Sequence, residues 1–258
     1  MTGEETDVAA DLRVEAVLNM QFPRRVAARA KPAVVDGTGH ESGRNLPAYG
    51  PSRRLFNVAL LLLLMLAGAA AARAETARLL LFGDSLTAGY GLPVAQGFPA
   101  RLEAALRAEG VDVQVINGGV SGDTSAGGLE RIDWALADRP THVLLALGAN
   151  DALRGLDPAR TEANLDAIIR KVEAAGAKLL LVGMYAPRNL GRDYADAFDG
   201  LYRRLAERHK VPLYPFFLEG VAADPALNQP DGIHPNAEGV AVMVRNILPY
   251  VKELLGAG

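Results

Sequence analysis

Three side chains that could work together as nucleophile, base and orienting acid occur at two distant places in the sequence. Ser85 follows a short apolar run that ends at Gly83, whereas Asp231 and His234 lie near the C-terminal end. A serine hydroxyl is a weak nucleophile that needs a base within hydrogen-bond reach, and a carboxylate fixes the tautomer of that base. Because Gly232 permits a tight turn, we expect Asp231 to reach Nδ1 of His234 while the other ring nitrogen faces Ser85.

An oxyanion that develops on the substrate needs hydrogen-bond donors. The candidates are the backbone N–H of Ser85, a loop N–H near Gly122 and the side-chain amide of Asn150. Together with the nucleophile and base, these donors predict a two-step acyl transfer to water through an acyl-enzyme.

Each of these residues also has a purely structural interpretation. Ser85 alone could cap a turn, and Asn150 could occupy a left-handed turn position. Asp123 and Asp151 could be caps or turn formers, and His234 alone could be a surface loop histidine. A catalytic role is favoured over these structural roles because the predicted sheet places all of the loops that carry these residues at one edge.

The sequence lacks the motifs of nucleotide-binding, metal-binding and α/β-hydrolase sites. No G-x-G-x-x-G or G-x-x-x-x-G-K-[ST] occurs after the first predicted strand, so we expect no nucleotide cofactor. Of the histidines after Ala74, His142 is expected to begin a strand and His209 to end a helix, and none has metal-ligand spacing. The nucleophile-elbow motif G-x-S-x-G is absent around Ser85, because Thr87 stands at the position of the second glycine. We therefore expect neither a metal nor a cofactor, and we reject the α/β-hydrolase interpretation.

The composition excludes further classes of partner and site. The chain has 258 residues, with 27 Lys and Arg against 30 Asp and Glu, which gives a formal net charge of −3. This mild acidity argues against a nucleic-acid partner. The absence of cysteine excludes disulfides, thiolate catalysis, cysteine-ligated metals and a lipoprotein anchor. Half of the residues are hydrophobic, which is enough for a sizeable core.

The N-terminal quarter is expected to lie outside the folded domain. Residues 1–54 show no sustained periodicity. We expect residues 1–52 to be a non-native or disordered extension, of which residues 1–50 are not normally made. Residues 53–74 combine Arg53-Arg54, an uncharged apolar stretch and Ala72-Arg73-Ala74. This pattern indicates a signal peptide cleaved after Ala74, although such a stretch could also anchor the chain in a membrane. Cleavage predicts a periplasmic or secreted domain of residues 75–258 without a stable membrane partner.

Strands and helices alternate through this domain. Short apolar runs predict strands at 78–82, 111–116, 142–147, 178–184 and 211–214. Apolar residues at helical spacing predict helices over 98–106, 127–137, 158–175, 198–205 and 240–251.

This alternation implies a five-stranded parallel sheet covered by helices on both faces. In such sheets the functional crevice lies beyond the carboxyl ends of the strands. The polar segments follow the strands, as this requires, at 83–85, 117–125 and 148–151.

Four segments resemble the sequence blocks of the GDSL or SGNH hydrolases, in the right order. Gly83-Asp84-Ser85-Leu86 is similar to the first block, and the segment from Asn117 to Ser125 to the second. Leu147-Gly148-Ala149-Asn150-Asp151 is similar to the third, although many members have glycine at Ala149. Asp231-Gly232-Ile233-His234-Pro235 resembles the fifth.

The resemblance implies a three-layer α/β/α sandwich with a flavodoxin-like sheet. It also assigns Ser85, Asp231 and His234 to catalysis, and Ser85, Gly122 and Asn150 to the oxyanion hole. Asp84 is expected to hold its loop by hydrogen bonds.

The branch that the chain most resembles is that of the bacterial thioesterases, lysophospholipases and arylesterases, whose members are periplasmic. An apolar acyl groove is expected from Leu153, Leu156, Ala186 and Pro187, and Met184 to Pro187 is similar to a mobile acyl-binding loop of that branch. We expect a monomer whose partner is a small acyl ester or thioester. A carbohydrate O-acetyl esterase and a catalytically silent acyl-binding protein remain as alternatives.

Overall fold

The computed structural model describes residues 76–258. The predicted extension at 1–52 and the predicted signal peptide at 53–74 therefore lie outside the described residues. Between residues 76 and 258, no helix combines the length and the apolar character needed to cross a bilayer.

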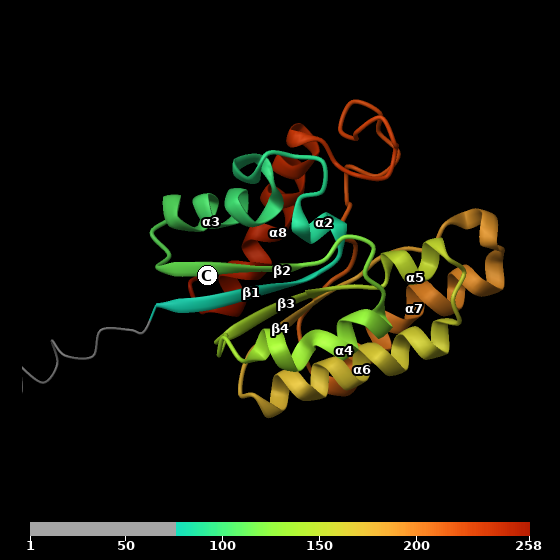
Figure 1. Cartoon of the computed structure of the whole chain (residues 1–258), viewed down its shortest axis with the longest axis horizontal. Coiled ribbons are helices and arrows are strands. Elements are labelled where there is room, and N and C mark those ends of the chain that lie inside the picture. Colours follow the sequence, from blue (N-terminus) through green and yellow to red (C-terminus); the bar gives the residue numbers. More distant parts are fainter. Residues whose placement is uncertain (1–75) are drawn as a thin grey trace, which may run out of the picture. The chain divides into compact units, whose positions relative to one another are not determined.

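The centre of the fold is a parallel sheet of five strands in the order β2-β1-β3-β4-β5, as Figure 1 shows. The strands are β1 (Ala77–Gly83), β2 (Val113–Gly119), β3 (His142–Ala146), β4 (Lys178–Val182) and β5 (Leu213–Tyr214). This order is the flavodoxin-like one, and it confirms the predicted architecture. The second strand begins two residues later than expected because Val111 is still bonded to the end of the preceding helix, its N–H donating to Leu106 O at 3.0 Å.

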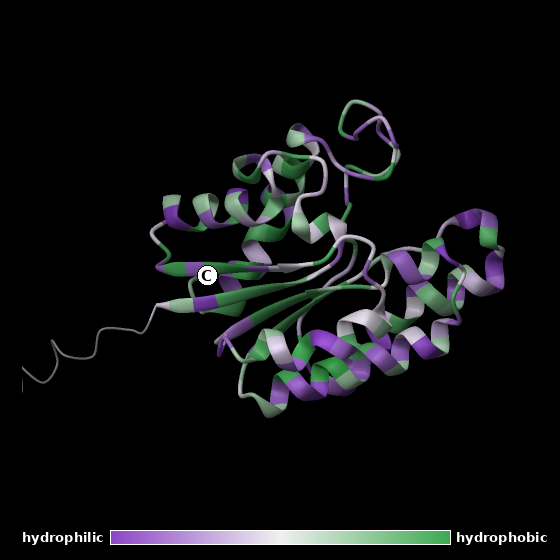
Figure 2. Ribbon diagram, viewed as in Figure 1, coloured by the Kyte–Doolittle hydropathy of each residue, from purple (hydrophilic) through white to green (hydrophobic). Residues whose placement is uncertain are grey.

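Strand β1 is an interior strand of the sheet and contributes to the core. Leu79, Leu80, Leu81 and Phe82 of β1 are all buried, because the sheet is covered on both faces. In register, Leu80 pairs with Ile116 of β2 on one side and with Val143 of β3 on the other. Figure 2 shows the strands mostly in the hydrophobic colour, while the helices alternate hydrophobic and hydrophilic residues. Continuous apolar runs in the sequence are therefore the buried strands.

Two groups of helices cover the two faces of the sheet (Figure 1). On one face lie α3 (Phe98–Ala108) and α8 (Ala237–Leu255). On the other face lie α4 (Ser125–Leu136), α6 (Pro158–Ala174) and α7 (Arg192–His209). The three-layer α/β/α arrangement is thus confirmed.

An ion-pair network joins α6 to α7. Arg204 pairs with Glu162 at 2.7 Å, while Arg208 and His209 contact Asp166 at 3.0 and 2.8 Å. Burial alone would raise the pKa of Asp166, but hydrogen bonds from Arg170, His209 and Arg208 lower it well below its usual range. His209 ends α7, as expected, and its role is structural.

Two short helices were not predicted, and both begin where a strand ends. They are α2 (Ser85–Ala88), directly after β1, and α5 (Ala149–Leu153), after β3. Single 3₁₀ turns occur at η1 (Val94–Gln96) and η2 (Arg188–Leu190). Segments of three to five residues are too short to show a helical period in sequence.

Candidate active site

The candidate nucleophile, Ser85, stands at the first position of α2, just after the carboxyl end of β1. Asp84 caps this helix, because its Oδ1 accepts a hydrogen bond from the N–H of Leu86 at 3.0 Å. The expected loop-holding role of Asp84 thus fits the structure. Burial raises the pKa of Asp84 to about 7, so its carboxyl group binds a proton much more readily than an exposed one. Only glycine fits at position 83, since a Cβ there would lie 2.7 Å from the Ala146 carbonyl oxygen of the neighbouring strand β3.

The hydroxyl, the imidazole and the carboxylate meet at this edge of the sheet. His234 Nε2 lies 2.9 Å from Ser85 Oγ, and His234 Nδ1 lies 2.7 Å from Asp231 Oδ2. The three side chains therefore form one continuous hydrogen-bonded chain, as the sequence predicted. In this geometry the imidazole can take the serine proton while the carboxylate stabilises the resulting positive charge.

The loop that carries the histidine is organised by Asp231. Its second oxygen, Oδ1, accepts hydrogen bonds from the backbone N–H groups of Ile233 and His234, both at 3.0 Å. The hydrogen bond with the His234 side chain, followed by these two backbone bonds, lowers the pKa of Asp231 to about 2. The carboxylate is thus held in its charged form. Gly232 has a φ of +74°, which confirms the tight turn expected there.

One aromatic ring packs against the imidazole, and further contacts hold the loop that carries it. The Tyr90 ring lies against the His234 ring, with centroids 4.6 Å apart. Gln229 Nε2 donates to the carbonyl oxygens of Tyr90 and Pro235, at 2.8 and 2.9 Å. An isolated β-bridge also joins Asn228 to Pro235. The histidine loop is therefore tied to the nucleophile side of the site.

The predicted oxyanion donors converge on the same cavity, which Ser85, Gly122 and Asn150 all line. Within residues 76–258, the backbone N–H groups of Ser85 and Gly122 donate to no protein acceptor. Gly122 has a φ of +80°, a left-handed conformation that favours glycine.

The Asn150 side chain is held in place by a hydrogen bond to a main-chain carbonyl group of a neighbouring loop. It lies in the first turn of α5, and its Nδ2 donates to the Asp123 carbonyl oxygen at 2.9 Å. The contact from Nδ2 to Asp84 Oδ2, at 3.5 Å, is at the limit of a hydrogen bond. An amide nitrogen carries two hydrogens, so one can fix the side chain while the other remains for an oxyanion. Ala149 begins the same helix and lines the cavity, so alanine at this position leaves the asparagine in place.

The two other acidic residues of these loops have structural contacts, and the N–H of Asp123 closes a turn by donating to the Val120 carbonyl oxygen at 3.1 Å. Thr124, rather than Asp123, caps α4, and Asp123 instead pairs with Arg131 at 2.7 Å. Asp151 is buried in α5 and accepts hydrogen bonds from the hydroxyl groups of Ser125 and Thr161, at 2.6 and 3.1 Å. Both aspartates therefore hold the loops together.

A mainly apolar cavity of about 510 Å³ opens beside the triad. Leu153, Ala186 and Pro187 line it, as the sequence predicted. Leu156 does not line it, and this expectation was wrong, because the residue lies past the end of α5, where its carbonyl oxygen accepts from the Tyr194 hydroxyl at 2.8 Å.

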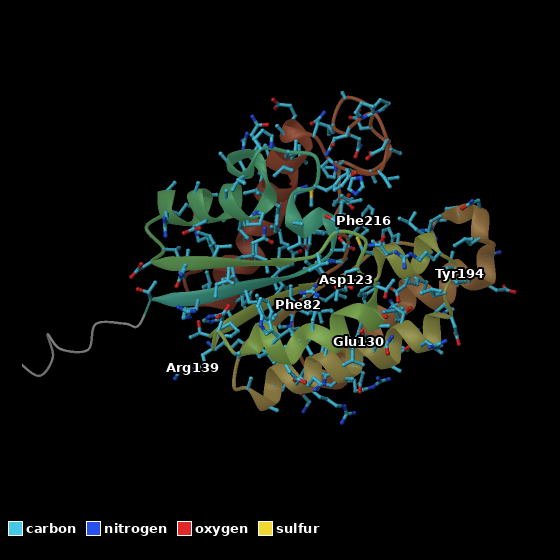
Figure 3. All side chains as sticks on the ribbon, viewed as in Figure 1. Phe82, Asp123, Glu130, Arg139, Tyr194 and Phe216 are labelled. Carbon is cyan, nitrogen blue, oxygen red and sulfur yellow. The ribbon has the colours of Figure 1, made fainter. Side chains whose placement is uncertain are left out.

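Two aromatic residues that the sequence did not single out form part of the cavity wall. The rings of Tyr185 and Phe216 stack with centroids 4.4 Å apart, and both residues line the cavity. The N–H of Ala186 donates to Asp199 Oδ1 of α7 at 2.8 Å, which fixes this loop on the helix below it. Figure 3 shows Phe216 and Asp123 near the carboxyl ends of the strands.

No cluster of three or more metal-ligating side chains occurs among residues 76–258. The chemistry described above requires only the side chains and backbone donors already named.

The chain belongs to the GDSL-like lipase/acylhydrolase family, whose model matches residues 81–242. It is therefore a hydrolase that acts on ester bonds.

Individual relatives support this assignment. The chain is 44% identical over 184 residues to "Esterase TesA" of Pseudomonas aeruginosa, covering 71% of this chain and 92% of the relative. It is also 44% identical over 169 residues to "Thioesterase 1/protease 1/lysophospholipase L1" of Escherichia coli K12, covering 65% of this chain and 79% of the relative. The crystal structure of the psychrotrophic esterase EstA from Pseudoalteromonas sp., inhibited by monoethylphosphonate, superposes with a TM-score of 0.67. EstA is 35% identical, and the match covers 70% of this chain and 100% of that one.

Proposed function

We propose that this protein is a serine esterase that hydrolyses carboxylic esters and thioesters of fatty acyl groups through Ser85, His234 and Asp231. The observation that carries the proposal is the hydrogen-bonded chain from Ser85 Oγ through the His234 ring to Asp231. Acylation begins when His234 Nε2 takes the Ser85 proton as Oγ attacks the substrate carbonyl carbon. The carbonyl oxygen becomes an oxyanion, which the N–H groups of Ser85 and Gly122 and the Asn150 amide bind.

The leaving group departs when His234 returns its proton to the alcohol or thiol. Water then attacks the acyl-enzyme, His234 takes a proton from that water, and Ser85 regains its hydrogen as the carboxylic acid leaves. Asp231 remains ionised throughout and stabilises the imidazolium form of His234.

The shape and lining of the cavity favour an acyl chain over a bare acetyl group. Its volume of about 510 Å³ and its wall of Met184, Tyr185, Phe216 and Leu218 offer apolar surface next to the nucleophile. Each methylene that leaves water on binding contributes about 0.8 kcal/mol. The names of the relatives, which include an esterase and a thioesterase/lysophospholipase, agree with acyl esters, lysophospholipids and thioesters as substrates.

The test is a panel of acyl chains from acetyl to palmitoyl, offered as esters of one alcohol and as thioesters of one thiol. We expect kcat/KM to rise from acetyl to octanoyl in both series, and Ser85→Ala to reduce every rate to near background. A strong acetyl preference would support a carbohydrate O-acetyl esterase instead. Turnover by wild-type protein no faster than by Ser85→Ala would support an acyl-binding protein.

We further propose that the chain is exported to the periplasm and that the segment 53–74 is removed by cleavage after Ala74. The proposal depends on the paired arginines, the apolar stretch and the Ala72-Arg73-Ala74 triplet in the sequence. Mass spectrometry of the N-terminus of the native protein tests it. We expect the first residue to be Glu75, and an intact apolar segment in the isolated protein would contradict cleavage.

A further inference from the structure

One arginine outside the proposed triad and oxyanion hole contacts three separate segments of the site. Arg131 lies on α4, and its Nε donates to Asp123 Oδ2 at 2.7 Å. Its Nη1 donates to the Gly118 carbonyl oxygen at 2.8 Å, and its Nη2 donates to the Gly83 carbonyl oxygen at 2.9 Å. The guanidinium carbon lies 4.0 Å from the centroid of the Phe82 ring, so this face of the group is also covered.

The three acceptors of Arg131 adjoin the proposed catalytic residues. Gly83 ends β1, two positions before Ser85, and Gly118 lies at the end of β2. Asp123 directly follows Gly122, the predicted backbone donor. A single planar cation therefore ties the nucleophile turn to the loop that supplies the oxyanion donor. Because the guanidinium group is rigid, it also fixes the spacing between these segments.

The same arginine acts on Asn150 through Asp123. The Asp123 carbonyl oxygen accepts the hydrogen bond that orients the Asn150 amide, at 2.9 Å. The Asp123 side chain is only 10% exposed, and its charge contributes to the raised pKa of buried Asp84. If Arg131 were absent, an unpaired carboxylate would stand behind the group that has to bind an oxyanion, and its carbonyl would lose its anchor.

We infer that Arg131 is a positioning residue that holds Gly122 and Asn150 in place for the oxyanion. The inference rests on the proposed function, since it assigns a role within that mechanism. Arg131 does not line the cavity, so it acts through its neighbours rather than by touching the substrate. Displacing a catalytic donor by about 1 Å can cost roughly 100-fold in rate.

The first experiment measures kcat and KM of the full-length protein with p-nitrophenyl butyrate for wild type, Arg131→Met and Arg131→Lys. We expect Arg131→Met to lower kcat by about 10- to 100-fold while KM changes less than about threefold, because the acyl cavity is untouched. The kcat of Arg131→Lys should lie between those of wild type and Arg131→Met, because lysine keeps the positive charge but cannot donate to all three acceptors with the geometry of a guanidinium group. If the methionine variant does not fold, the comparison of wild type with Arg131→Lys still tests the inference.

The second experiment separates positioning from a general loss of stability. In an Asn150→Ala background, Arg131→Met should lower kcat by a clearly smaller factor than in the wild-type background, because one of the two donors that Arg131 holds is already gone. The matched control is Arg204→Met, which breaks a comparable arginine–carboxylate pair on α7. It should lower Tm without lowering kcat.

Two results would overturn the inference: an Arg131→Met kcat within twofold of wild type, or an equal fold-loss with and without Asn150. Ser85→Ala is assayed in parallel. If Ser85→Ala remained active, both the proposed function and this inference would fail. If only Ser85→Ala were inactive while Arg131→Met kept its kcat, this inference alone would fail.

Discussion

Ser85 Oγ and His234 Nε2 lie 2.9 Å apart, although 149 positions separate the two residues in the chain. The pair forms because β1 delivers the serine to the carboxyl edge of the sheet, while the loop before α8 returns to the same edge. Tyr90 and Gln229 then hold the imidazole against the nucleophile side. The reactivity of the site depends on this tertiary contact rather than on either residue alone.

Replacing Asp231 by asparagine should disable the base while keeping the shape of the loop. An amide at this position favours the wrong tautomer of His234, and we expect kcat to fall on the order of 10⁴-fold. Because the pKa of Asp231 is about 2, the wild-type carboxyl is ionised above pH 4, so the deficit should persist across the whole assay range.

Asp224→Asn is the matched control for Asp231→Asn. Asp224 Oδ1 also accepts a backbone hydrogen bond in an exposed loop, from the N–H of Ala226 at 2.9 Å, but it does not contact the triad. Its kcat should equal that of wild type. An Asp231→Asn enzyme within tenfold of wild type would contradict the assigned role.

Removing the Asn150 amide should cost mainly transition-state stabilisation. Asn150→Ala is expected to lower kcat by roughly 10²- to 10³-fold with a much smaller change in KM. Asn246→Ala removes a similar amide, which donates to the Glu219 carbonyl oxygen at 2.9 Å on an exposed part of the fold. Steady-state kinetics measure kcat and KM for both variants. An equal loss of kcat in the two would contradict a specific role for Asn150.

Protonation of Asp84 should make the stability of the protein depend on pH. Burial raises its pKa from 3.8 to about 7, so the folded state keeps a proton that the unfolded state has released between these values. The free energy of unfolding contributed by this group therefore falls as pH rises from about 4 to 7, by up to about 1.4 kcal/mol per pH unit, and levels off above pH 7.

Asp84→Asn removes this titration. Urea unfolding at pH 5, 6, 7 and 8 should show wild type losing stability relative to Asp84→Asn up to pH 7, with little further change at pH 8. A difference between the two proteins that stayed constant over this range would contradict the raised pKa.

Filling the cavity wall should shorten the preferred acyl chain. Ala186 is buried and lines the cavity, so the three carbons that Ala186→Leu adds take the space of about three methylenes of substrate. At about 0.8 kcal/mol each, their loss should lower the octanoyl-to-acetyl ratio of kcat/KM by roughly 50-fold.

Ala175→Leu, at the exposed end of α6, should leave this ratio unchanged. An unchanged ratio in Ala186→Leu would show that the acyl chain binds elsewhere.

Most of the fold was predictable because its strands are buried on both faces. Runs such as Leu79 to Phe82 have no alternation, which indicates strands of a parallel sheet covered by helices on both faces. The meeting of Ser85 with the Asp231–His234 pair was also predictable, since both lie on loops at one edge of the predicted sheet.

The details that escaped prediction depend on contacts between distant segments. Nothing about Arg131 in the sequence indicates that its side chain spans two strand ends and Asp123. Tyr90 likewise gives no sign that it lies against His234, because their contact is tertiary. Leu156 was misplaced for the same reason, since α5 is too short to be detected and it turns this residue away from the cavity.

The most direct test of the account is covalent labelling of the wild-type protein with a fluorophosphonate ester, followed by peptide mass spectrometry and activity assay. We expect one label per chain, located on Ser85, with activity lost in proportion to labelling. His234→Ala should react at least 100-fold more slowly, because its serine has no base. Complete inactivation with the label on another residue, or equal labelling rates in wild type and His234→Ala, would contradict the account.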